Sequence, residues 1–179
     1  MSLEPLNSAS ATIQVHAWAA ILALLFGVVM LVRAKGTVVH RRLGRYWLVA
    51  MLVTVISSFF IHELRIWGPW SPIHVLSLIT LVLMLRAWVA IRQRKVALHA
   101  DLMKSAFYNA LLLATFFTFL PGRIMHEVVF GPAPEGMPQG AVPMWAWIVI
   151  GVVAVLGGRH AWAMWRKRRP GQARRSVLH

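Results

Sequence analysis

Residues 13–32 read IQVHAWAAILALLFGVVMLV, an uncharged run in which the imidazole of His16 is the sole group that titrates near neutral pH. A helix of this length rises about 30 Å, which is the thickness of the hydrocarbon core of a bilayer. Lipid offers the backbone no hydrogen-bond partners, so a single segment that crosses it is helical. The run therefore predicts a transmembrane helix.

Four further stretches have the same character and are separated by turn or charge signals: residues 46–67, 72–91, 105–120 and 144–164. Ser71 before Pro72 predicts the start of one of them, because serine caps helices and proline suits the first helical position. We expect an all-α, polytopic membrane helix bundle, with a four-helix core over residues 13–123 and a fifth, C-terminal transmembrane helix. A short N-terminal segment (residues 1–12), an irregular Pro/Gly-rich loop (121–143) and a basic tail (165–179) complete the chain.

Composition argues against a soluble protein and against a nucleic-acid-binding protein. Of 179 residues, 59% are hydrophobic and 13% are charged, whereas soluble domains are nearer half apolar and a quarter charged. The formal charge of +14 does not indicate nucleic acid, because the basic residues lie between long uncharged runs. The sequence contains no cysteine, so a metal or redox site would have to use histidine, methionine, carboxylate or a bound cofactor.

The basic residues also predict the orientation of the chain in the membrane. All but two of the 19 lysines and arginines lie at or after the ends of the first, third and fifth predicted helices; the exceptions are Arg65 and Arg123. Cytoplasmic loops are enriched in lysine and arginine. We therefore expect the N-terminus outside and the C-terminus in the cytoplasm.

Three histidines are predicted to lie at the outer ends of three helices: His16, His62 and His74. Ionisable side chains in a membrane usually face the bundle interior, and helical rise places these three within about one to two turns of the same depth. Two imidazoles could hold a haem iron, and three could hold copper, zinc or iron. The alternative is a structural polar cluster that bonds helix ends, loops or lipid headgroups.

A second and weaker set of metal-ligand candidates, His40, His99 and His160, falls at the predicted cytoplasmic ends of the helices and is expected at the interface. Arg123, directly after Pro121-Gly122, could bind a carboxylate or a cofactor propionate through its fork of donors. A structural pairing of Arg123 with Glu127 or Glu63 is the other interpretation.

The sequence resembles a family of predicted bacterial membrane proteins, domain of unknown function 2306 (DUF2306), over roughly Val15 to Arg123. The residues that carry the resemblance are His16, the loop from Lys35-Gly36-Thr37 through His40 to Arg45, Ser71-Pro72-Ile73-His74, His99 and Pro121-Gly122-Arg123. It implies a multi-pass protein of the bacterial inner (cytoplasmic) membrane. More distantly, the pattern is similar to four-helix di-haem cytochrome b-type proteins, which implies haem b. Those proteins pair their ligands within helices, so a single outer site suits this chain better.

The leading hypothesis is a redox-associated membrane protein that binds haem or a metal through its outer histidines, as an oxidoreductase or an electron-transfer protein. Its partners would be the lipid bilayer and a redox partner, a quinone or the subunits of a membrane complex. One alternative is a small transporter or channel for protons or metal ions. Another is a non-catalytic accessory subunit of a larger membrane complex.

Overall fold

The computed structural model describes residues 1–62, 68 and 70–132. They belong to the first of two compact units, Met1–Ala141, and the second unit is Val142–His179. The described elements are all helical, which confirms the predicted fold class for this part of the chain. The predicted fifth transmembrane helix, the basic tail and His160 lie outside the described residues.

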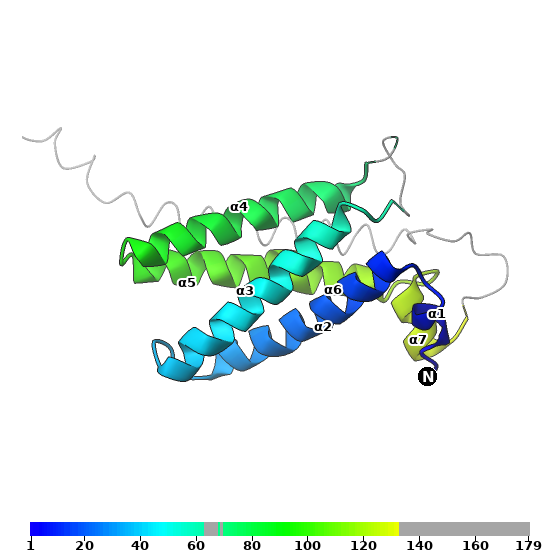
Figure 1. Cartoon of the computed structure of the whole chain (residues 1–179), viewed down its shortest axis with the longest axis horizontal. Coiled ribbons are helices and arrows are strands. Elements are labelled where there is room, and N and C mark those ends of the chain that lie inside the picture. Colours follow the sequence, from blue (N-terminus) through cyan, green and yellow to red (C-terminus); the bar gives the residue numbers. More distant parts are fainter. Residues whose placement is uncertain (63–67, 69, 133–179) are drawn as a thin grey trace, which may run out of the picture. The chain divides into compact units, whose positions relative to one another are not determined.

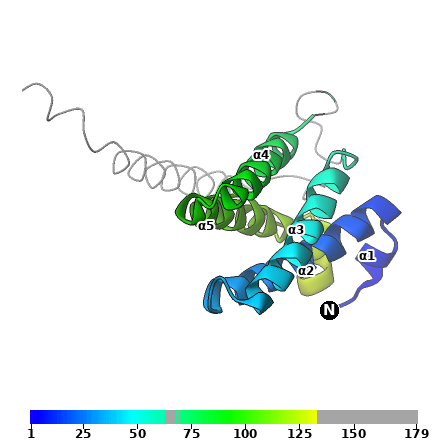
Figure 2. The same ribbon diagram turned by 60° about the vertical axis from the view of Figure 1, so that its left-hand side comes forward.

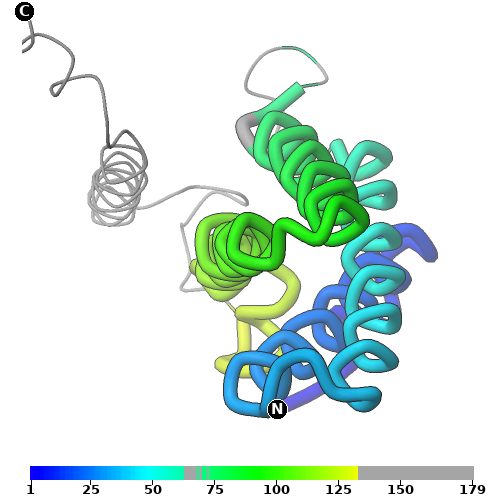
Figure 3. The backbone as a smooth tube through the Cα atoms, turned by 90° about the vertical axis from the view of Figure 1, so that its left-hand side faces the viewer, coloured from blue at the N-terminus to red at the C-terminus, as the bar shows by residue number. Residues whose placement is uncertain are grey.

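The helices follow one another with short connections. In chain order they are α1 (Glu4–Asn7), α2 (Ala11–Val32), α3 (Val38–Ser58), α4 (Pro72–Arg92), α5 (Val96–Ser105), the π-helix η1 (Ala106–Leu112), α6 (Leu113–Thr118) and α7 (Ile124–Phe130). The segment from α5 through η1 to α6 runs without a break. Helices α2 and α3 lie side by side, and so do α4 and α5 (Figures 1 and 2). Figure 3 shows these two pairs nearly end-on.

The bounds of α2 and α4 agree with the hydropathy pattern to within two residues, whereas α5 begins earlier than predicted, and α3 begins at Val38 and ends at Ser58 instead of at residues 46 and 67. His62, which was predicted on this helix, lies in the connection that follows it. Helix α3 begins at Val38, where the Thr37 hydroxyl accepts the His40 N–H at 3.1 Å and caps the helix. The physical reason for the difference is that hydropathy marks the apolar part of a helix. A capped helix continues through polar residues beyond that part.

A short helix also forms where the sequence predicted an irregular loop. Helix α7 packs against α1, and Leu6, Ala17 and Val128 are buried together at this contact. Ile124 and Val128 are four residues apart, so both apolar side chains lie on one face of α7. The remainder of the predicted loop, residues 133–143, lies outside the described part.

Two helical stretches are long and apolar enough to cross a membrane, Ala11–Val32 and Ile73–Arg92. In α4, the residues at every third or fourth position are small, polar or flexible and are buried: Ser71, His74, Ser77, Thr80, Met84, Ala87 and Ala90. Large apolar residues between them, such as Leu78 and Leu85, are exposed. Such surface is unfavourable in water but suits lipid, where small residues mediate helix contacts. The total number of spans and their orientation stay predictions.

The centre of the bundle is apolar and closely packed. One cluster of buried residues joins all the long helices: Ala23, Trp47, Ala50, Met51, Met84, Ala106, Phe107 and Leu111. Gly27 lies against this cluster, and a Cβ atom there would overlap the Phe107 ring and approach the Trp47 Nε1 atom to 2.9 Å. The glycine thus lets α2 approach α3 and η1 closely.

Candidate functional site

The predicted outer histidines lie at one end of the bundle: His16 is near the start of α2, His62 follows the end of α3, and His74 is near the start of α4. Figure 1 shows these helix ends on the same side of the bundle. We call this region the histidine end, and its polar residues are His16, Ser57, Ser58, His62, Ser71, His74 and Ser77. Hydrogen bonds tie the three helices together there. The Nδ1 atom of His16 lies 3.0 Å from Ser57 Oγ, and Ser58 Oγ lies 2.7 Å from Ser77 Oγ.

His74 is the most deeply buried ionisable residue of the histidine end, with 2% of its surface exposed. It occupies the third position of α4, after the Ser71 cap and the Pro72 that the sequence predicted. Its Nδ1 atom accepts the backbone N–H of Ser71 at 3.1 Å and lies 3.0 Å from Ser71 Oγ. In a capping box, a glutamate or glutamine side chain at the third helical position accepts the backbone N–H of the N-cap residue in the same way.

The contact with the Ser71 backbone indicates which nitrogen of a neutral His74 ring carries the proton. A backbone N–H can only donate, so Nδ1 uses its lone pair, and the neutral ring then carries its proton on Nε2. The Nε2 atom is buried, and within residues 1–62, 68 and 70–132 it has no hydrogen-bond partner. His74 thus presents a donor to the interior of the histidine end.

Aromatic side chains and a second imidazole surround the His74 ring. Its centroid lies 5.3 Å from that of Trp70, 5.5 Å from that of His62 and 6.2 Å from that of Phe59. The His62 and Trp70 side chains are exposed, whereas Phe59 is half-buried. The structure therefore brings His62 and His74 together, from the two sides of the α3–α4 connection.

The hydrogen bonds of Ser57 favour the opposite tautomer for His16. The single hydroxyl hydrogen of Ser57 is directed to the carbonyl oxygens of its own helix, with Val53 O at 2.6 Å and Thr54 O at 3.1 Å. Ser57 Oγ is then the acceptor for His16, which donates from Nδ1. The Nε2 atom of His16 consequently keeps its lone pair, the form in which a histidine binds a metal.

The predicted metal-binding sets are assembled only in part. Among the described residues, no group of three or more histidine, aspartate or glutamate side chains is placed to hold one metal ion. The His62 and His74 rings lie next to each other, and His16 lies at the same end of the bundle, where it is hydrogen-bonded to Ser57. Arg123 precedes α7 as its N-cap residue and is half-buried. Glu63, one of its predicted partners, lies outside the described residues.

The described members of the second set are His40, in the first turn of α3, and His99, near the start of α5. His99 Nδ1 donates to the Ala87 carbonyl at 3.0 Å, and the buried His40 Nδ1 has no hydrogen-bond partner among the residues that the structure describes. Burial lowers the pKa of His40, and the positive charges of His99, Lys35 and Arg41 lower it further. His40 and His99 are thus close enough to interact, but positive neighbours disfavour a bound cation.

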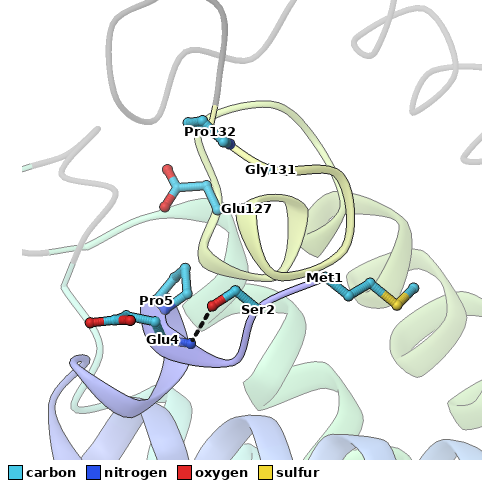
Figure 4. Close-up of a pocket in the computed structure, with 7 residues that line it drawn as sticks. All are labelled: Met1, Ser2, Glu4, Pro5, Glu127, Gly131 and Pro132. Atoms are coloured by element: carbon cyan, nitrogen blue, oxygen red, sulfur yellow. Dashed lines mark hydrogen bonds between the residues drawn. The ribbon is translucent and has the colours of Figure 1, made fainter.

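A hollow of about 350 Å³ lies near the N-terminus, between the first residues of the chain and α7 (Figure 4). Glu4 and Glu127 line it, and Pro132 lies at its rim. None of the predicted histidine ligands lines this hollow, so it is not part of the histidine end.

Sequence reasoning placed the three histidines at one end and predicted Ser71 as the cap before His74, but it did not single out two further polar residues on the same face of α4. Ser77 and Thr80 continue the buried series of Ser71 and His74 at intervals of three residues. Polar residues at that spacing within an apolar helix share one face, so this signal was present in the sequence. The aromatic neighbours Phe59 and Trp70 carried no such signal.

A family model described as "Predicted membrane protein (DUF2306)" matches residues 13–157 of the chain. The match includes the whole histidine end. No curated protein and no solved structure matches the sequence.

Proposed function

The chain belongs to the DUF2306 family of predicted membrane proteins, and from this premise we propose that it is a redox-associated protein that binds a haem or a transition-metal ion at the histidine end. The observation that carries the proposal is the hydrogen bond between His16 and Ser57. It leaves the Nε2 lone pair of His16 available as a ligand and fixes the orientation of the ring, as partners of metal-binding histidines do.

The second ligand in this proposal is His62. Two nitrogen ligands of one metal lie roughly 3 to 4 Å apart when each metal–nitrogen bond is about 2 Å long. We take the ring separation of 5.5 Å between His62 and His74 as support for placing His62 within reach of a group bound at the histidine end. His74 itself would be a ligand only in the tautomer in which Nδ1 donates to Ser71 Oγ.

A bound haem or redox-active metal would supply one-electron chemistry. The residues of the chain would hold and orient it: His16 through its lone pair, and Ser57 by fixing the His16 ring. Arg123, half-buried at the start of α7, is proposed to bind a propionate if the group is haem.

The described interior gives less support to the alternative of a proton or metal transporter. The buried polar series of α4 ends at Thr80, and the next buried residue on the same face is Met84. Met84 packs with Met51 and Phe107 in the apolar cluster. A polar path through the described helices would have to cross this apolar layer.

The proposal is tested on the full chain purified in detergent. Its visible absorption spectrum is recorded oxidised and after dithionite reduction, and the metal content of the same sample is measured. We expect either a haem Soret band that shifts on reduction or a bound transition metal. A colourless and metal-free preparation would contradict the proposal, and stoichiometric co-purification with other proteins would then favour an accessory subunit.

Matched variants locate the site. His16→Ala should remove the pigment or the metal. His126→Ala should retain it, because His126 Nδ1 contacts the Phe119 carbonyl at 3.0 Å and His126 is in neither predicted set. Equal content in the two variants would rule out His16 as a ligand.

A further inference from the structure

We propose that the His74 Nε2–H group is the hydrogen-bond donor for a carbonyl oxygen of a quinone headgroup bound at the histidine end. This inference rests on the proposed function for its redox meaning, since it names the class of the redox partner. The binding itself requires neither a haem nor a metal.

The first step is that His74 is held as a donor. Its Nδ1 atom accepts the Ser71 backbone N–H at 3.1 Å. The Ser71 N–H is fixed by the backbone at the start of α4, whereas the Ser71 hydroxyl, 3.0 Å from Nδ1, can rotate away. Because the neutral ring has a single proton, that proton is on Nε2.

The second step is that none of the described residues provides an acceptor for this donor. The side chain is 2% exposed, and no residue in the described part of the chain is a hydrogen-bond partner of its Nε2 atom. Buried polar groups in proteins are nearly always paired, since an unpaired one loses its bonds to water without replacement. Ser58, Ser77 and Thr80, which are buried on the same side of the bundle, all have partners in the structure. An acceptor from a bound molecule would complete the set.

The third step concerns the charge of that molecule. His74 lies in the first turn of α4, a helix of 21 residues. The N-terminal end of a helix carries a partial positive charge, which favours an oxygen acceptor and disfavours a metal cation. At His74 the partial charge of the helix end and the proton on Nε2 thus both favour an oxygen acceptor.

The fourth step concerns the shape and solubility of that molecule. The Phe59 and Trp70 rings flank His74, and aromatic walls with few polar groups suit a planar apolar ligand. Trp70 is 56% exposed, and large apolar residues such as Val75 are exposed on the first turns of α4. A ligand dissolved in the bilayer could therefore approach His74 from lipid. A quinone headgroup is planar, lipid-soluble and bears carbonyl oxygens.

The test is equilibrium binding of a short-chain ubiquinone and a short-chain menaquinone to the full chain in detergent, by isothermal titration calorimetry. His74→Gln keeps the capping-box contact with Ser71 and retains an N–H donor, so binding should stay within about threefold of wild type. His74→Leu has no donor and should weaken binding about tenfold or more. Ser71→Ala keeps the backbone N–H and should leave binding within about threefold. Equal binding by the Leu and Gln variants would overturn the proposal.

Two further measurements keep the proposal falsifiable if His74→Leu does not fold. Nitrogen-15 NMR of histidine-labelled wild-type protein should show a protonated Nε2 at His74, with a resonance that shifts when quinone is added. A protonated Nδ1, or no shift, would refute the donor role. Excess phosphatidylcholine should not displace the quinone; displacement would identify a lipid ester carbonyl as the occupant and overturn the assignment. Quinone binding can be measured whether or not the preparation contains a haem or a metal. The quinone proposal can therefore fail while the haem or metal proposal holds, and the reverse.

Discussion

Gly27 offers the sharpest test of the bundle's packing. A Cβ atom at this position would overlap the Phe107 ring and lie 2.9 Å from Trp47 Nε1. Both neighbours are large, and both are buried in the apolar cluster. Neither ring can move away without displacing other core residues. Gly27→Ala should therefore force a shift of α2 away from α3 and η1.

The magnitude follows from two opposing effects. Replacing glycine by alanine within a helix stabilises it by about 1 kcal/mol. Overpacking a closely packed core costs about 1–3 kcal/mol. We expect a net destabilisation of up to about 2 kcal/mol for Gly27→Ala, the difference between these two effects.

The matched control is Gly44→Ala. Gly44 lies within α3, and a Cβ atom there would meet only the Met30 side chain at 3.5 Å, an ordinary contact. This variant should be neutral or more stable than wild type. Thermal unfolding in detergent, followed by helical circular dichroism, compares the two. Equal stabilisation of both variants would show that the contact between Gly27 and Phe107 is wrong.

Three other predictions concern the polar groups. Ser57→Ala removes the acceptor of His16 and should lower haem or metal affinity about 10- to 100-fold, measured by titrating the purified protein; unchanged affinity would argue against His16 as a ligand. The variants Ser58→Ala and Ser77→Ala, alone and combined, should show a coupling energy of about 0.5–1.5 kcal/mol in a double-mutant cycle of unfolding, whereas additive effects would exclude the 2.7 Å bond. The pKa of His40 is lowered in the folded protein, first by burial. The neutral form of His40 therefore contributes stability above pH 6.5, the pKa of the unfolded chain, and this contribution is lost as the pH falls through the folded pKa. His40→Gln should reduce the loss of thermal stability between about pH 7 and pH 5, and an unchanged pH profile would refute this.

The sequence predicted those helices whose ends coincide with changes in hydropathy. Helices α2 and α4 are bounded by charged or capping residues, so their limits could be read directly. The early starts of α3 and α5 could not, because charged residues such as Arg41 in α3 and Asp101 in α5 interrupt the apolar pattern before the predicted starts. The π-helix Ala106–Leu112 was also unpredicted. Its wider turn depends on how the chain packs, and no residue type marks it.

The sequence predicted where the three histidines lie but not which of them offers a lone pair and which an N–H donor. Helical rise alone put His16, His62 and His74 at similar depth. The tautomers of His16 and His74 depend on hydrogen bonds to Ser57 and Ser71, which required the three-dimensional structure. A spacing of histidines cannot distinguish a lone pair from an N–H donor. For this reason we predicted all three from the sequence as equivalent ligands.

Whether the histidine end binds a redox group is tested most directly by one measurement, the visible spectrum of the purified wild-type chain before and after dithionite, read together with its metal content. We expect a Soret band that shifts on reduction or, without one, a bound transition metal that His16→Ala loses. A preparation with neither pigment nor metal would contradict the proposed function.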